Sequence, residues 1–240
     1  MATATVSRKS SPKPTARVAR FNPALVGGTT VRAKTDQRAD PVAVHFRQGD
    51  VADSSCGLCC VSIALAALGL VKATALESMT RRRHGVASDV WRVFQPTFFT
   101  GINAPELCEA VRSLELPLRL TMRHAEDRKD VEAHKSVSDF ALTSLRQGAL
   151  VMLAYASLRD RHQHWLLATG VGGLECRRSV DYETIYVLDP SCDPLPLAVY
   201  NSTLSRVERK GTVHPAWNLD GGGGYFVPVT LVSAIRFDLA

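Results

Sequence analysis

One cysteine is a candidate nucleophile because of its position in the chain. Cys56 follows the polar segment 47–55 and begins the alanine-rich run 56–68, which ends at Gly69. The run is apolar on nearly every face, so it predicts a buried helix, with Ser54, Ser55 and Asp53 as candidate capping residues. A helix N-terminus carries partial positive charge, which favours a thiolate over a thiol. The sequence therefore predicts a reactive thiol at the first turn of a buried helix.

His164 and Asp189 are placed to assist such a nucleophile. A cysteine nucleophile needs a base within hydrogen-bond reach and a third group that orients the base. His164 begins the apolar segment 164–171, and Asp189 ends the apolar segment 185–189, which a proline follows. Both segments predict strands. If these strands are antiparallel neighbours, both side chains emerge at one end of the sheet, so we expect His164 to be the general base and acid and Asp189 to orient it.

Gln48 is the candidate donor for an oxyanion hole. It precedes Cys56 in the chain, and its side-chain amide could donate to the oxygen of a tetrahedral intermediate together with the backbone N–H of Cys56. Seven residues separate the two, so this assignment depends on how the intervening loop folds. His162 is the alternative base, because it shares the face of His164 if the strand extends that far.

The remaining cysteines have the spacing of core residues. Cys56 and Cys59 are separated as zinc ligands are, but a structural zinc site needs a second pair, and the cysteines later in the chain occur singly, at Cys108, Cys176 and Cys192. Cys59 and Cys60 lie on the predicted buried helix, where cysteine behaves as a small hydrophobic residue. We expect no metal and no cofactor.

Around these residues the chain predicts helices first and strands later. Apolar periodicity and turn residues place helices at 56–68, 74–83, 103–114 and 138–146, and strands at 116–122, 149–155, 164–171, 185–189, 225–229 and 233–237. This order favours an α+β fold, in which the buried helix packs on a C-terminal antiparallel sheet.

The 240 residues divide by charge into a basic tail and a near-neutral remainder. Residues 1–38 carry eight Lys or Arg and one acid, so their net charge is +7, which leaves −1 for residues 39–240. The tail has too few large apolar residues to offset its ordering entropy, so we expect it to be disordered. It fits a solubilising tail, an organelle transit peptide or a basic arm that touches nucleic acid or an acidic partner. Residues 39–240 form one expected domain, whose charge gives no support for a nucleic-acid-binding face.

Hydropathy and cysteine usage favour a reducing, intracellular setting. No apolar run reaches the roughly 18 residues that span a bilayer, and the N-terminus lacks the apolar centre of a signal peptide. The six cysteines are irregularly spaced and two are adjacent, unlike those of a secreted disulfide framework. We therefore expect a cytoplasmic protein without membrane contact, in which Cys56 stays a free thiol.

The order of these motifs resembles that of the papain-like cysteine peptidases. A glutamine and a Cys-Gly helix start lie in 48–70, His-Trp and Thr-Gly lie in 164–171, and Asp-Pro lies in 186–191. The pattern is most similar to the double-glycine, bacteriocin-processing branch, and it covers about residues 42–195. The resemblance implies a papain-like fold, with an N-terminal helical part and a buried nucleophile helix packed on a C-terminal antiparallel sheet. It implies the same four roles. Cys56 is the nucleophile, His164 the base and acid, and Asp189 the group that orients it. Gln48 is the oxyanion donor.

The activity that this resemblance implies is hydrolysis of a peptide or isopeptide bond in a peptide or protein substrate, through a thioester on Cys56. Two alternatives remain open: an inactive papain-like module that binds or regulates a partner, and a peptidyl or acyl transferase with the same chemistry. Phytochelatin synthases have a similar Cys-Gly-Leu start, found here at 56–58, but their other motifs are absent. Because the double-glycine branch favours glycine pairs, Gly27-Gly28 is a candidate processing site.

Overall fold

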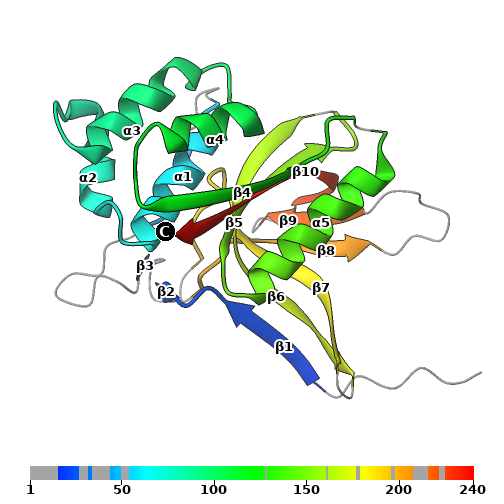
Figure 1. Ribbon diagram of the computed structural model, residues 1–240. Coiled ribbons are helices and arrows are strands. Elements are labelled where there is room, and N and C mark those ends of the chain that lie inside the picture. Colours follow the sequence, from blue (N-terminus) through cyan, green and yellow to red (C-terminus); the bar gives the residue numbers. More distant parts are fainter. Residues whose placement is uncertain are drawn as a thin grey trace, which may run out of the picture.

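The computed structural model describes residues 16–26, 32–33, 44–49, 54–127, 129–160, 162–176, 179–195, 198–207, 216–221 and 225–240. Its helices precede most of its strands in the sequence, and the strands curve into a closed sheet beside the helices (Figure 1).

The helical part begins at the candidate nucleophile. Helix α1 (Cys56–Ala67) is buried along its whole length, as its apolar composition predicts. It is followed by α2 (Ala73–Glu77), α3 (Val86–Phe94) and α4 (Ala104–Arg112), with short 3-10 turns at Met79–Arg81 and Gln95–Thr97. Helix α5 (Val131–Arg146) comes later in the chain, between two strands. None of the helices in the described part of the chain has both the length and the hydropathy needed to cross a bilayer.

Six strands form a closed antiparallel barrel. They are β5 (Leu150–Ser157), β6 (Gln163–Cys176), β7 (Ser179–Leu188), β8 (Ser202–Val207), β9 (Ala216–Gly221) and β10 (Tyr225–Leu239). Each strand pairs with the next in sequence, and β10 returns to pair with β5. Two further strands extend this barrel: β4 (Leu118–His124) pairs with the end of β10, and β1 (Ala16–Phe21) pairs with the end of β6.

The predicted fold class, a papain-like α+β fold, is wrong. The structure is mostly β, and its sheet closes into a barrel. Closure depends on the pairing of β5 with β10, which places Leu150 opposite Phe237. Alternation of apolar residues predicts that each segment is a strand, but it does not predict whether the first and last strands of a sheet meet. The long strands β6 and β10 also carry register shifts, at Ala168/Gly170 and at Leu231/Ser233, and such irregularities bend a sheet toward closure.

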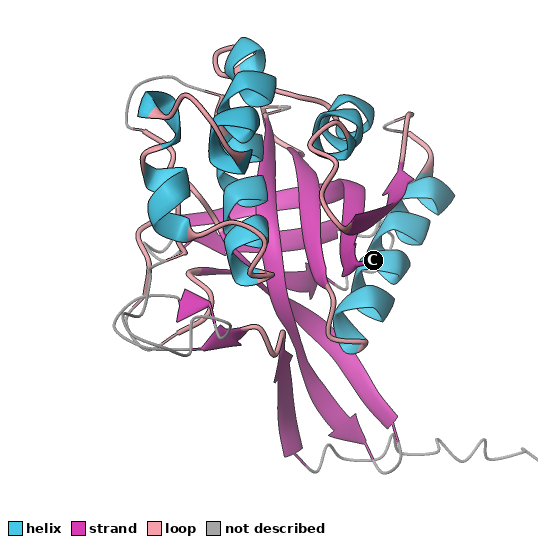
Figure 2. Cartoon of the chain, turned by 60° about the vertical axis from the view of Figure 1, so that its left-hand side comes forward, coloured by secondary structure: helices cyan, strands magenta, loops and turns pink. Residues whose placement is uncertain are grey.

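Two buried clusters share strand β5, whose side chains are buried on both faces. Alternate residues such as Val151, Leu153 and Tyr155 join the barrel interior and α5. The residues between them, Leu150, Met152 and Ala154, join the cluster formed with α1. Figure 2 shows the resulting layers, in which helices flank the strands on both sides. This arrangement packs α1 against the outside of the barrel wall that includes β5 and β6.

Part of the segment expected to be a disordered tail forms strands. Strand β1 pairs with residues 170–175 of β6, and β2 (Leu25–Val26) pairs with β3 (Arg32–Ala33). Ladder hydrogen bonds give these residues order that their composition does not predict. Residues 1–15, 27–31 and 34–43, including Gly27-Gly28, lie outside the described residues, so the tail, its boundary at residue 38 and the processing site stay predictions.

Candidate active site

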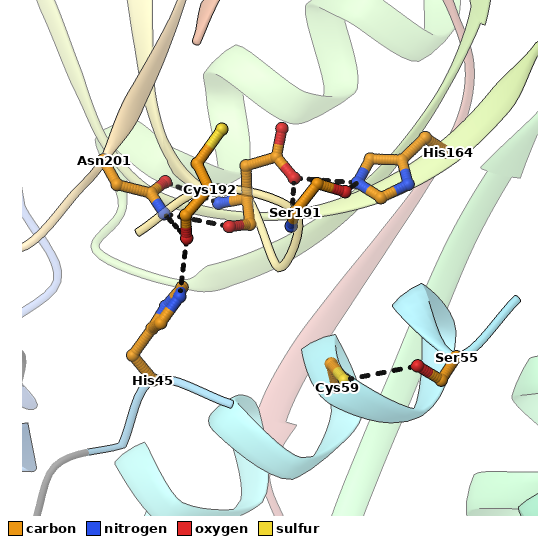
Figure 3. A network of polar contacts seen from close by, with 8 residues as sticks. His45, Ser55, Cys59, His164, Ser191, Cys192 and Asn201 are labelled. Atoms are coloured by element: carbon orange, nitrogen blue, oxygen red, sulfur yellow. Dashed lines mark hydrogen bonds and ion pairs between the residues drawn. The ribbon is translucent and has the colours of Figure 1, made fainter. Parts of the chain in front are cut away.

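Cys56 is the first residue of α1 and its side chain is buried. The serines before it do not cap the helix as predicted. The hydroxyl of Ser55 contacts Cys59 Sγ at 3.8 Å (Figure 3) and makes no capping hydrogen bond. The hydroxyl of Ser54 donates to the carbonyl of Phe99 instead. The helix start therefore places Cys56 at the positive end of α1 without a side-chain cap from Ser55.

His164 and Asp189 meet at one end of the β6–β7 pair. The two strands are antiparallel neighbours with Leu167 opposite Leu188, so the start of β6 lies beside the residue that follows β7. His164 Nε2 is 2.8 Å from Asp189 Oδ1. The exposed fractions are 5% for His164 and 4% for Asp189. At this distance and burial, the contact is a charge-assisted hydrogen bond when the imidazole is protonated.

The thiol of Cys56 is hydrogen-bonded to His164. Burial alone would raise the pKa of this thiol, but the hydrogen bond and charge of His164, with the N–H groups of Trp165 and Gly57, lower it. Burial likewise opposes a charged His164, yet hydrogen bonds to Asp189 and Cys56 and their charges raise its pKa to about 10. Burial also opposes ionisation of Asp189, but His164 holds the pKa of that carboxyl below its usual value. All three shifts favour a thiolate–imidazolium pair oriented by a carboxylate.

The pKa values of two other cysteines, Cys60 and Cys108, are shifted in the opposite direction. Burial and the neighbouring Cys56 and Cys59 raise the pKa of the Cys60 thiol well above its ordinary value, although Cys60 lies on the same helix. Burial raises the pKa of Cys108 as well. The hydrogen bond and charge of His164, which lower the pKa of Cys56, distinguish it from these two thiols.

The contacts of the His164 ring assign its two nitrogens. Nε2 faces Asp189 and lies 3.2 Å from the hydroxyl of Ser191, which leaves Nδ1 for Cys56. In the neutral ring, an Nε2–H that donates to the carboxylate leaves a lone pair on Nδ1 to accept the thiol proton. The arrangement can therefore transfer a proton from Cys56 to His164 while Asp189 stabilises the resulting charge.

The loop after Asp189 is held by hydrogen bonds to its main chain (Figure 3). Asn201, which is 1% exposed, accepts from the Asp189 N–H at 2.7 Å and donates to the Asp189 carbonyl at 2.8 Å and the Cys192 carbonyl at 3.1 Å. His45 Nε2 lies 3.0 Å from the same Cys192 carbonyl. These contacts fix the position of the Asp189 backbone, and hence the direction of its carboxylate.

Gln48 lies in the cavity that also exposes Cys56 and His164. Its backbone N–H donates to the carbonyl of Pro190 at 2.8 Å, which ties the segment 44–49 to the loop after Asp189. Residues 50–53, which join Gln48 to the nucleophile helix, lie outside the described residues. The structure thus brings all four candidate residues to one place, while the oxyanion role of Gln48 stays a prediction.

The cavity has a volume of about 800 Å³ and lies in front of Cys56. Its lining includes residues 100–104 and Glu106, around the start of α4. It also includes His124 at the end of β4, Gln163 at the start of β6 and Ser233 within β10. A cavity of this size is within the range of ligand sites. His164 and Asp189 also line a second cavity of about 410 Å³, together with Tyr155, Leu219 and Val227 of the cluster that fills the barrel interior.

His162 lies beside the site but is not the base that contacts Cys56. Its ring centroid is 6.0 Å from that of His164, and it lines both cavities. The hydrogen bond to the thiol comes from His164, so the geometry favours His164 over His162.

Sequence comparison adds nothing to this geometry. The chain matches no protein-family model and no curated protein. The resemblance to papain-like peptidases therefore stays a prediction. In the part of the chain that the structure describes, no three His, Cys, Asp or Glu side chains are grouped to hold a metal ion.

The sequence did not predict a role for three residues of the site, Gly57, Ser191 and Asn201. Gly57 lets the side chain of Ile102 approach the helix start, since an added Cβ would lie 2.7 Å from Ile102 Cγ2. The Cys-Gly pair is a local pattern that could have indicated this close packing. Ser191 and Asn201 have no such pattern, because their contacts depend on how β6, β7 and β8 are arranged.

Proposed function

We propose that the protein is a cysteine hydrolase, which cleaves a peptide or isopeptide bond through a thioester on Cys56. The observation that carries this proposal is that one buried imidazole, His164, is hydrogen-bonded to a thiol on one side and to the carboxylate of Asp189 on the other. This is the geometry that nucleophilic catalysis by cysteine needs. The adjacent cavity supplies room for a peptide segment.

The reaction proceeds in two steps. The Cys56 thiolate attacks the carbonyl carbon, the C–O π electrons move to oxygen, and the Cys56 N–H and the Gln48 amide donate to the oxyanion. The oxyanion collapses, the C–N bond breaks, and the proton on His164 Nδ1 goes to the leaving amine. A water then gives a proton to His164 and attacks the thioester, and the carboxylic acid leaves as Cys56 is regenerated.

The contact between Cys56 and His164 favours this function over a catalytically inactive binding module. An inactive module has no requirement for a histidine that lowers the pKa of the thiol, or for a carboxylate behind that histidine. A peptidyl or acyl transferase would use the same residues and differ only in the acceptor. The two activities separate by product mass when a primary amine is added to the assay, since a transferase converts the amine into an amide.

Site-resolved alkylation tests the nucleophile. Native protein is treated with iodoacetamide near neutral pH, and each cysteine is quantified by peptide mass spectrometry, with Cys59, Cys60 and Cys108 as internal controls. We expect Cys56 to react at least about tenfold faster than these, because a thiolate is the reactive form. Equal labelling of Cys56 and Cys60 would contradict the proposal.

A panel of fluorogenic peptide and isopeptide substrates tests the activity. Cleavage by wild type should be lost in Cys56→Ala and reduced by about 10²-fold or more in His164→Gln. Cleavage that persists at the wild-type rate in Cys56→Ala would exclude a thioester on Cys56.

A further inference from the structure

Ser191 lies at the junction between His164 and Asp189. Its hydroxyl is 3.2 Å from His164 Nε2, and its backbone N–H donates to Asp189 Oδ1 at 2.8 Å. The Ser191 side chain is hydrogen-bonded to the same carboxyl group. Figure 3 shows the Ser191 side chain beside the ring of His164. One serine thus contacts both the orienting carboxylate and the ring that it orients.

The protons at this junction have one consistent arrangement when Asp189 is ionised. A carboxylate only accepts hydrogen bonds, so the His164 Nε2–H and the Ser191 O–H both donate to it. The hydroxyl then presents a lone pair to Nε2–H. If the hydroxyl instead donated to Nε2, the proton of the neutral ring would sit on Nδ1. Nδ1 would then have no lone pair to accept the proton of Cys56.

We propose that Ser191 is a positioning residue, whose hydroxyl and N–H hold the Asp189 carboxylate against His164 and keep the proton of the neutral ring on Nε2. The inference rests on the proposed function, in which Nδ1 of His164 takes the thiol proton. Ser191 is itself exposed, so its side chain contributes little to the buried core.

The surroundings of the ring indicate what loss of the hydroxyl does. Among the residues that the structure describes, Cys56, Asp189, Tyr155 and His162 are titratable groups that face His164, the last two at centroid distances of 5.8 and 6.0 Å. The hydrogen bonds and charges that raise the pKa of His164 come from Asp189 and Cys56. Without the hydroxyl, Asp189 loses a donor and Nε2–H loses an acceptor. The imidazolium becomes less favourable, so the thiolate fraction of Cys56 falls.

The test follows the rate of Cys56 alkylation by iodoacetamide against pH in the full chain. In Ser191→Ala, the rise of the rate with pH should move upward by about half a unit to one unit, and the rate at neutral pH should fall about threefold to tenfold, the effect of one hydrogen bond. Ser191→Thr, which keeps a hydroxyl, should retain the wild-type profile. Ser113→Ala, a change at an exposed serine that lines neither cavity, is the matched control.

Each outcome decides the proposal. An unchanged profile in Ser191→Ala overturns the role of Ser191 and leaves the proposed function standing. Equal shifts in Ser191→Ala and Ser191→Thr also overturn it, because the hydroxyl is then not the cause. If wild-type Cys56 follows the profile of an ordinary thiol, both the proposed function and the positioning role fail. Should Ser191→Ala not fold by circular dichroism, Ser191→Gly keeps the N–H and removes the hydroxyl, and the same shift or its absence decides.

Discussion

At the scale of residues, the site contains three ionisable groups whose burial opposes their charged forms. Cys56, His164 and Asp189 nevertheless have pKa values shifted toward those charged forms, because each is hydrogen-bonded to the next. Removing one member leaves the others in a buried environment without compensation. The three groups should therefore titrate as a unit, and the pH dependence of stability should depend on which members are present.

His164 gives a pH-dependent stability that can be isolated by removing the thiol. In Cys56→Ala, we expect the hydrogen bond and charge of Asp189 to keep the pKa of His164 above the 6.5 of the unfolded chain, against the effect of burial. The folded state then binds the proton more tightly, so this stabilisation is fully present below pH 6.5 and is lost as pH rises through the folded pKa. That folded pKa is about 10 in the intact site, and lower once the Cys56 hydrogen bond is gone.

The measurement is urea denaturation of Cys56→Ala and of Cys56→Ala/His164→Gln from about pH 6 to about pH 10. The difference between their free energies of unfolding should decrease with increasing pH, by about 1.4 kcal/mol for each unit of pKa shift that remains. A difference that stays constant over this range would mean that the folded chain does not stabilise the imidazolium.

At the scale of elements, the start of α1 and the loop between β7 and β8 position the site. The helix start fits closely beneath the side chains of Ile102 and Trp165, and the Trp165 Nε1–H donates to the Ile102 carbonyl at 2.9 Å. The loop is held by Asn201, the last residue before β8. Each element is therefore sensitive to a single substitution away from the reacting atoms.

Gly57→Ala should destabilise the protein and displace the nucleophile. The new Cβ would lie 2.7 Å from Ile102 Cγ2. Because isoleucine is β-branched, the Ile102 side chain has little freedom to move away. We expect a loss of about 1–3 kcal/mol in the free energy of unfolding and slower alkylation of Cys56. In an Ile102→Ala background the same substitution should cost less, and a double-mutant cycle measures the difference. Equal costs in both backgrounds would rule out this contact as the cause.

Asn201→Ala should cost about 2–4 kcal/mol in the free energy of unfolding, measured by urea denaturation. The substitution leaves the N–H and carbonyl of Asp189 without their side-chain partner, and buried polar groups left unsatisfied are costly. The Cys192 carbonyl loses one of its two side-chain contacts and keeps that with His45. Asn218→Ala in β9, at a half-buried asparagine, is the matched control and should cost less than about 1 kcal/mol. Similar costs for the two substitutions would mean that the hydrogen bonds of Asn201 to the loop after Asp189 do not stabilise the fold.

At the scale of the whole molecule, a closed barrel carries α1 on one wall and β1 as an extension of β6. The base and its orienting carboxylate belong to the barrel, whereas the nucleophile belongs to the helical layer. The site therefore forms only when the two layers pack together. Strand β1 lies beside the later half of β6, beyond the residues that pair with β5, so it can be released without opening the barrel.

Gly170→Ala should release β1. A Cβ at Gly170 would overlap the Arg20 carbonyl oxygen and the ring of Phe21, because the two strands approach closely there. Limited trypsin digestion should then cleave after Arg17 and Arg20 faster than in wild type, since a detached strand is accessible to protease. Arg119, which lies in the β4–β10 pair, should stay protected in both proteins. Unchanged cleavage after Arg17 and Arg20 would contradict the expected displacement of β1.

Local sequence patterns predicted much of the candidate site and less of the fold. Cys56 was found from an apolar run that begins at it, and His164 and Asp189 from their places at the ends of apolar segments. The antiparallel β6–β7 pair that these places required is present. Ser191 and Asn201 were not found, since short polar residues in a turn look alike in sequence whether or not they contact a buried carboxylate.

Local composition was enough to predict the buried helix at Cys56 and the strands that begin near His164 and end near Asp189, because burial and alternation act over a few neighbouring residues. The tertiary structure alone decided that the strands close into a barrel and that β1 joins β6. It also decided that Ser191 and Asn201 gather around Asp189. Those features depend on backbone pairing and hydrogen bonds between segments far apart in the chain, such as β5 with β10. The turn that sets the register within a hairpin does not act between such segments.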